Sequence, residues 1–159
     1  MRPSAFACLQ MGVVLILAIG KTGVAADRAD WSSLSIWKDH TPADRVSPGK
    51  TMFLDTPRIA RGLREVLPDA EWKLLRHVYT LGDTFSVTDH YLIGDVCRPH
   101  DCGAENATMV FDLKSDNFWI AMFAHVGRTV STRWFGTADY VDLPPAVLAA
   151  VLSVHRPLP

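Results

Sequence analysis

The spacing of hydrophobic residues changes once along this chain of 159 residues, from a helical repeat to an alternation. Between residues 57 and 79 the apolar side chains recur every three or four positions, which is typical of a helix that packs one face on a core. From residue 81 to residue 134 they mostly alternate with polar residues, which is typical of β-strands. Helices followed by a run of strands predict an α+β fold with an antiparallel sheet.

Along the chain, helices are expected before and after the strand region, and a short apolar element is expected before the first helix. Thr56-Pro57 can begin the first helix, because threonine caps helices and proline suits the first helical position. Pro68 ends this helix and begins a second, and residues 142–145 open a last one. The expected core residues of these elements are Trp31, Leu34, Ile36 and Trp37, then Ile59, Leu63, Val66 and Leu67, then Trp72, Leu75 and Tyr79, and finally Leu148, Val151 and Leu152.

Four strands are expected between residues 85 and 134. The first spans residues 85–93, where Asp89 falls on the apolar side and predicts a bulge or an early strand end. The others cover residues 107–113, 118–125 and 130–134. Residues 118–125 are apolar on both faces, as in a central strand that is covered on both sides. The sequence therefore predicts one domain, an antiparallel meander flanked by helices.

The N-terminus has the features of a secretory signal. Arg2 supplies a positive charge, residues 6–19 are almost wholly apolar, and small residues precede Asp27, so cleavage is expected after Ala26. The apolar run of about 14 residues is shorter than the roughly 20 that span a bilayer, which argues against a stable membrane anchor. The sequence thus predicts a signal peptide over residues 1–26 and a domain over residues 27–159.

Removal of this signal changes the charge and the cysteine count. The remaining 133 residues hold 14 Lys and Arg against 17 Asp and Glu, a net charge of −3, and their length suits a single core. A mildly acidic chain is a poor candidate for binding nucleic acid. Cys8 is lost with the signal, so only Cys97 and Cys102 remain, and an exported protein exposes them to an oxidising compartment where they are expected to pair.

The most distinctive segment is Cys97-Arg98-Pro99-His100-Asp101-Cys102, between two expected strands. A disulfide would close a ring of six residues and contribute about 2 kcal/mol by its effect on the unfolded chain. The proline fixes its own φ and restricts the residue before it. The ring would project from one end of the sheet with an imidazole and a carboxylate at its tip, a common place for binding residues.

Other interpretations of the same residues remain open at this point. The ring could be a plain structural crosslink with a solvated tip. A zinc site would need free thiolates and a fourth ligand, such as His90 or His125. A redox pair would normally be spaced as C-x-x-C. No G-x-S-x-G, H-E-x-x-H or phosphate-binding loop is present. The sequence predicts no metal, no cofactor and no enzymatic activity, with a thiol- or metal-dependent enzyme as an alternative.

The hexapeptide and the glycine after it resemble the C-K-P-H-D-C loop of the Ivy family, the bacterial periplasmic inhibitors of vertebrate lysozyme. The similarity extends in order and spacing from residue 67 to residue 134. It includes Leu67-Pro68 before a tryptophan-bearing helix and Leu81-Gly82-Asp83-Thr84 before a strand. The N-terminal segment, residues 27–55, is longer than the family pattern. The resemblance implies a periplasmic protein that occludes the active-site cleft of c-type lysozyme.

The resemblance also implies roles for the ring residues. In Ivy proteins the histidine of the loop contacts the two catalytic carboxylates, which assigns this contact to His100. Asp101 and Arg98 would contact the rim of the cleft, while Pro99 and the disulfide hold the shape. Arg98 stands where the family usually has lysine, which keeps the charge but changes the donor geometry. His100→Ala is expected to weaken inhibition strongly while the fold stays intact.

The resemblance leaves the choice of partner partly open. Lytic transglycosylases of the bacterium itself also use an acidic catalytic residue, so the same ring could control them instead. A monomer and a homodimer both fit the sequence. Side-by-side assays on both enzyme classes would separate the two targets.

Overall fold

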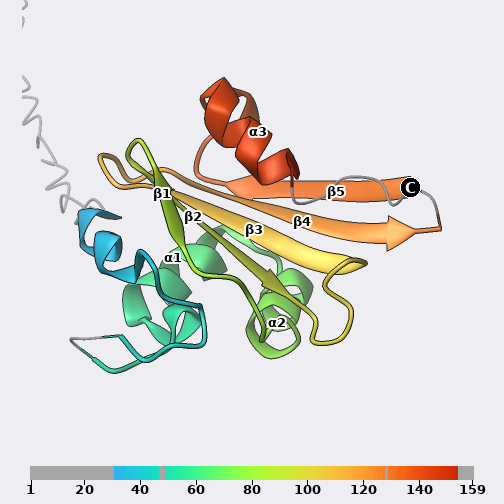
Figure 1. Cartoon of the computed structure of the whole chain (residues 1–159), viewed down its shortest axis with the longest axis horizontal. Helices are drawn as coiled ribbons and strands as arrows, with labels where there is room; N and C mark the ends of the chain where they lie inside the picture. Colours follow the sequence, from blue (N-terminus) through green and yellow to red (C-terminus); the bar gives the residue numbers. More distant parts are fainter. Residues whose placement is uncertain (1–30, 47–48, 128, 154–159) are drawn as a thin grey trace, which may run out of the picture.

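The computed structural model describes residues 31–46, 49–127 and 129–153. Its centre is an antiparallel five-stranded sheet in which neighbours along the chain are neighbours in space (Figure 1). This arrangement confirms the predicted α+β meander. The strands are β1 (Ser86–Thr88), β2 (Tyr91–Cys97), β3 (Glu105–Asp112), β4 (Phe118–Val126) and β5 (Thr129–Gly136).

The larger core lies on the face of the sheet that carries the first two α-helices. The elements on this face are η1 (Trp31–Trp37), η2 (Phe53–Asp55), α1 (Pro57–Val66) and α2 (Asp69–His77). The predicted helix residues Ile59, Leu63, Trp72 and Leu75 are all buried. Trp31 packs edge-on against Phe111 and Phe118 of the sheet, with ring centroids 5.3 and 5.7 Å apart. The N-terminal segment therefore contributes directly to this core.

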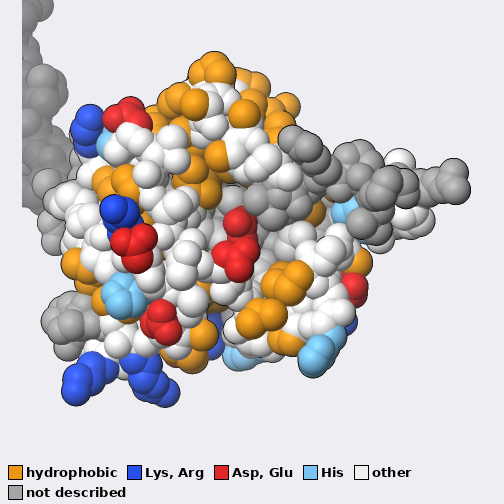
Figure 2. Space-filling view, in the orientation of Figure 1, with side chains coloured by type: hydrophobic (Ala, Val, Ile, Leu, Met, Phe, Trp, Pro, Cys, Tyr) orange, Lys and Arg blue, Asp and Glu red, His pale blue; other side chains and the backbone are white. Residues whose placement is uncertain are grey.

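The opposite face is covered by the C-terminal helix α3 (Pro145–Ser153), which follows η3 (Tyr140–Asp142). Val147 and Val151 are its buried residues. The expectation that Leu152 lies on the buried face is wrong, because its side chain is 45% exposed. The helix turns Val147 and Val151, which are four residues apart, toward the sheet instead. Figure 2 shows hydrophobic side chains gathered at the surface over this helix.

Strand β4 is covered on both faces, as its apolar sequence predicts. Ile120 and Met122 belong to the core beneath α1 and α2, whereas Trp119, Ala121 and Phe123 belong to the core beneath α3. The period of two places successive side chains on opposite faces.

Two expectations about the N-terminal half need correction. Ile36 is 47% exposed and does not help to fix η1 on the core. The single strand expected over residues 85–93 is instead the hairpin of β1 and β2, with Thr88 opposite Tyr91. Asp89 forms the turn with a φ of +56°, so the early strand end that its position suggested is confirmed.

The expected signal peptide lies outside the described residues. Across the part of the chain that the structure describes, no helix is long and apolar enough to cross a membrane.

Candidate binding site

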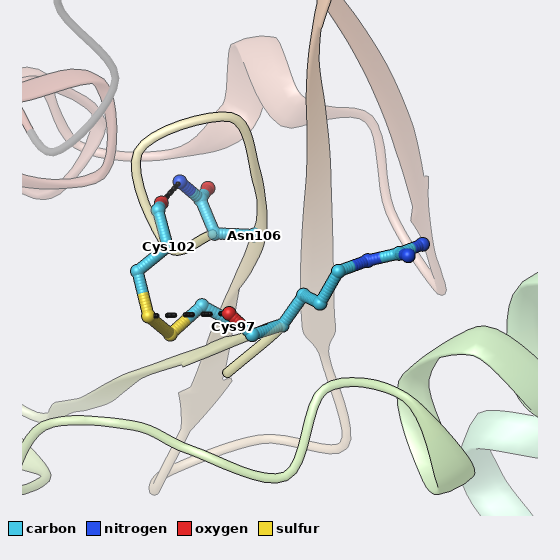
Figure 3. The surroundings of a disulfide bond; sticks show 4 residues. Cys97, Cys102 and Asn106 are labelled. Atoms are coloured by element: carbon cyan, nitrogen blue, oxygen red, sulfur yellow. Dashed lines mark hydrogen bonds between the residues drawn. A yellow bond between two sulfur atoms is a disulfide. The ribbon is translucent and has the colours of Figure 1, made fainter. Parts of the chain in front are cut away.

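The six-residue ring connects β2 to β3 at one end of the sheet (Figure 1). Cys97 is the last residue of β2, and the chain returns to the sheet at Glu105. A disulfide joins Cys97 to Cys102, whose Cα atoms lie 4.8 Å apart (Figure 3). The expected pairing is thus confirmed, and neither sulfur is a free thiolate that could bind a metal. Among the described residues no group of three or more His, Cys, Asp or Glu could hold a metal ion.

The base of the ring is hydrogen-bonded on both sides, to strand β3 and to the segment that precedes β1. Cys97 faces Asn106 of β3 in the ladder. On its other side the Cys97 N–H donates to the Leu81 carbonyl at 2.7 Å, and the Leu81 N–H donates back at 3.3 Å. The next residue, Gly82, lies so close to the backbone of Asp95 that a Cβ would overlap the Asp95 carbonyl oxygen. The glycine permits this close approach, which brings the segment after α2 alongside the ring base.

The tip of the ring is a tight turn that begins at Arg98. The Asp101 N–H donates to the Arg98 carbonyl at 3.0 Å, which closes a four-residue turn. Pro99 occupies the second position, where its fixed φ fits, and His100 occupies the third with a φ of +67°. This pattern is that of a type II turn, in which the third position favours glycine. A histidine there is held in the left-handed region, which costs about 1–2 kcal/mol for a residue with a Cβ.

Further hydrogen bonds fix the return limb of the ring. The N–H groups of Ala104 and Glu105 both donate to the Asp101 carbonyl at 3.0 Å. The Asn106 side-chain amide donates to the Cys102 carbonyl at 2.7 Å (Figure 3). The His125 N–H of β4 donates to the Ala104 carbonyl at 2.8 Å, so the limb is also joined to the neighbouring strand.

The structure separates the four candidate binding residues into two groups. Pro99, His100 and Asp101 are exposed together at the tip. Arg98 is only partly exposed, and its guanidinium forms an ion pair with Glu105 at 2.6 Å. A proline, an imidazole and a carboxylate are therefore exposed together on a crosslinked turn, while the arginine is held by its own chain.

A comparison with protein families identifies the family of the chain that carries this ring. A family model described as "Inhibitor of vertebrate lysozyme (Ivy)" matches residues 58–156. The chain belongs to the Ivy family. No curated protein and no solved structure matches it. The match in this Ivy protein begins inside α1, so η1 and η2, which help to fill the core, precede the matched region.

Three residues support the ring of this Ivy protein in a way that the sequence did not predict. Leu81, Glu105 and Asn106 act through backbone pairing or contacts that depend on strand register. The signal that could have found Glu105 is its position directly across the β2–β3 hairpin from Arg98. This position can be recognised only when the register that pairs Cys97 with Asn106 is known, and the sequence does not predict that register.

Proposed function

We propose that this Ivy protein inhibits vertebrate c-type lysozyme by placing the tip of its disulfide-closed ring in the active-site cleft. Membership of the family supports a role as a lysozyme inhibitor in general. The observation that carries the finer proposal is the conformation of His100, which is exposed at the tip with a positive φ. Glycine is the usual residue at this position of a type II turn, so histidine places an exposed imidazole there at a cost in backbone strain.

The rigidity of the ring favours binding. Association immobilises side chains and loops, at about 0.5–1.5 kcal/mol for each flexible side chain that is ordered. The disulfide, Pro99 and the turn hydrogen bond between Asp101 and Arg98 restrict the tip before it meets a partner. Less conformational entropy is then lost on binding, so more of the interaction energy contributes to affinity.

The chemistry of the tip suits a pair of carboxyl groups. A lysozyme places a protonated and an ionised carboxyl group on either side of the bond that it cleaves. A protonated imidazole offers two N–H donors, so His100 could bind both groups and occupy the space of the sugar. Asp101 would accept a hydrogen bond from a donor on the rim of the cleft.

We also propose that residues 1–26 are removed on export and that the protein acts in the periplasm. The N-terminal sequence supports this location. Mass spectrometry of the exported protein would give the cleavage site, and a mature chain that does not begin at Asp27 would contradict it.

The deciding experiment is a bacterial lysis assay with a c-type lysozyme and the purified mature protein. We expect His100→Ala to weaken inhibition at least tenfold, the scale of a central interface residue. Alanine is itself strained at a positive φ, so His100→Asn is the matched variant, because asparagine tolerates this region. Loss of inhibition in both variants with unchanged thermal unfolding supports the proposal. Full inhibition by a folded His100→Asn protein would exclude it.

Two parallel measurements address the remaining alternatives. A lytic transglycosylase assayed with the same variants tests the second target. Metal analysis and a titration of free thiols test a thiol- or metal-dependent enzyme.

A further inference from the structure

We propose that Arg98 is a positioning residue whose ion pair with Glu105 holds the ring at a fixed angle to the sheet, rather than a residue that contacts the enzyme. One of its two tests, the inhibition assay, rests on the proposed function, whereas the other, hydrogen exchange, does not. The carrying observation is that the guanidinium Nη2 lies 2.6 Å from the Glu105 Oε2.

The two residues lie directly opposite each other where the ring leaves the sheet. The last ladder pair is Cys97 and Asn106, and the next step pairs Arg98 with Glu105 through an N–H to carbonyl bond of 3.2 Å. Side chains at opposite positions of an antiparallel pair share one face and can interact directly. The ion pair therefore spans the root of the ring, at the point where a hinge would otherwise form.

The pair lies on the face of the sheet that carries α2. Side chains alternate between the two faces along a strand. Val96 and Ala107 form one pair of the ladder and belong to the core on this face, and the next pair, Cys97 and Asn106, points to the other face. Arg98 and Glu105 follow on the same side as Val96 and Ala107.

The surroundings of Tyr79 support this placement. The tyrosine follows α2 and is buried, and its burial raises the pKa of the phenol. The Glu105 carboxylate raises this pKa further, whereas the Arg98 and Arg133 guanidinium groups oppose the rise. The Nε atom of Arg98 is buried as well. Part of the Arg98 side chain is thus buried on the α2 face of the sheet, although 43% of the side chain stays exposed.

The Arg98–Glu105 ion pair complements the hydrogen bonds that attach the ring to the sheet. The hydrogen bonds of Cys97 hold the base in the plane of the sheet. Hydrogen bonds that lie in the plane of a sheet oppose tilting toward either face less than they oppose movement within the plane. An ion pair on one face opposes tilting away from that face and so fixes the direction in which His100 is presented.

Two assignments for Arg98 predict opposite results for Glu105→Gln. If Arg98 contacted lysozyme, loss of Glu105 would free the guanidinium and leave inhibition unchanged or improved. If the pair positions the ring, inhibition becomes weaker by about two- to fivefold, the effect expected of a half-exposed ion pair. Arg98→Gln should weaken it equally.

The reversed pair, Arg98→Glu with Glu105→Arg, is the rescue variant. It removes the positive charge from position 98 but keeps an ion pair across the ring root. We expect it to recover most of the inhibition that either single variant loses. Arg133→Gln is the matched control, because it breaks the Arg133–Glu71 ion pair on the same face and should leave inhibition unchanged.

Hydrogen exchange provides a readout that does not depend on lysozyme. The Arg98 amide is bonded to the Glu105 carbonyl, and we expect it to exchange faster in Glu105→Gln and at the native rate in the reversed pair. If the native protein inhibited no lysozyme, the proposed function would fail, but hydrogen exchange would still test whether the Arg98–Glu105 ion pair holds the ring. An unchanged exchange rate in Glu105→Gln, or a reversed pair that rescues neither readout, would overturn the inference.

Discussion

Two glycines beside the ring have opposite surroundings. A Cβ on Gly82 would overlap the Asp95 carbonyl oxygen and would approach the Pro42 ring within 3.0 Å, whereas a Cβ on Gly103 would meet no atom within 4 Å. A backbone oxygen in a ladder cannot move aside, so we expect Gly82→Ala to lower the free energy of unfolding by about 1–3 kcal/mol. Gly103→Ala should change it by less than about 0.5 kcal/mol and should inhibit lysozyme normally. Urea unfolding measures both, and equal losses would contradict the interpretation.

The site could be predicted from the sequence as far as its residues are local. Cys97, His100 and Cys102 belong to one short segment whose composition already indicates an exposed crosslinked turn. The positive φ of His100 and the partner of Arg98 could not be predicted in the same way. The first depends on the hydrogen bond that closes the turn, and the second depends on the register of two strands.

At the scale of elements, the ring is a connection whose shape is held by both the disulfide and hydrogen bonds. We expect the variant Cys97→Ser with Cys102→Ser to remain folded, because the hydrogen bonds of Cys97, Asn106 and Ala104 persist. The crosslink contributes about 2 kcal/mol by the chain-entropy estimate. Part of this restraint is lost at the tip, so inhibition should fall by about three- to thirtyfold. Inhibition assays of the oxidised and variant proteins measure the difference.

Reductant supplies the control for this prediction. It should weaken the native protein toward the level of the double variant and leave the double variant unaffected. Equal potency of the native protein with and without its crosslink would show that the hydrogen bonds alone hold the tip.

The elements themselves could be predicted where hydrophobic spacing was unambiguous. Helices α1 and α2 and strand β4 agree with the sequence, because their buried residues follow one clear period. The β1–β2 hairpin was concealed, because the apolar residues keep odd positions in the sequence across the turn at Asp89. In the structure Val87 packs on the α1 and α2 face, whereas Tyr91 and Ile93 pack on the α3 face. The buried face of α3 was also misassigned, because the helix is apolar on several sides and only packing selects between them.

At the scale of the whole molecule, the stability should depend on the ionisation of Asp95. Burial raises the pKa of this carboxyl above its ordinary value of 3.8, and nearby Asp83 raises it further, although a hydrogen bond from the Thr108 hydroxyl opposes the shift. The folded chain then binds this proton more tightly than the unfolded chain does. The contribution to stability is therefore fully present below pH 3.8 and is lost as the pH rises through the raised pKa of the folded state.

Asp95→Asn should remove this dependence while keeping an oxygen that accepts from the Thr108 hydroxyl. We expect it to increase the free energy of unfolding at pH 7 by about 0.5–1 kcal/mol and to have a smaller benefit at pH 4. Urea unfolding of both proteins at a series of pH values measures the difference between them. A difference that does not vary with pH would show that the carboxyl does not titrate differently in the two states.

The sequential order of the strands has a consequence for how the molecule matures. Contacts between segments that are close along the chain form quickly, since little chain entropy is lost in bringing them together. The two thiols sit on a single β2–β3 hairpin, only five positions apart. They can meet as soon as that hairpin forms, so oxidation need not wait for the rest of the chain to assemble.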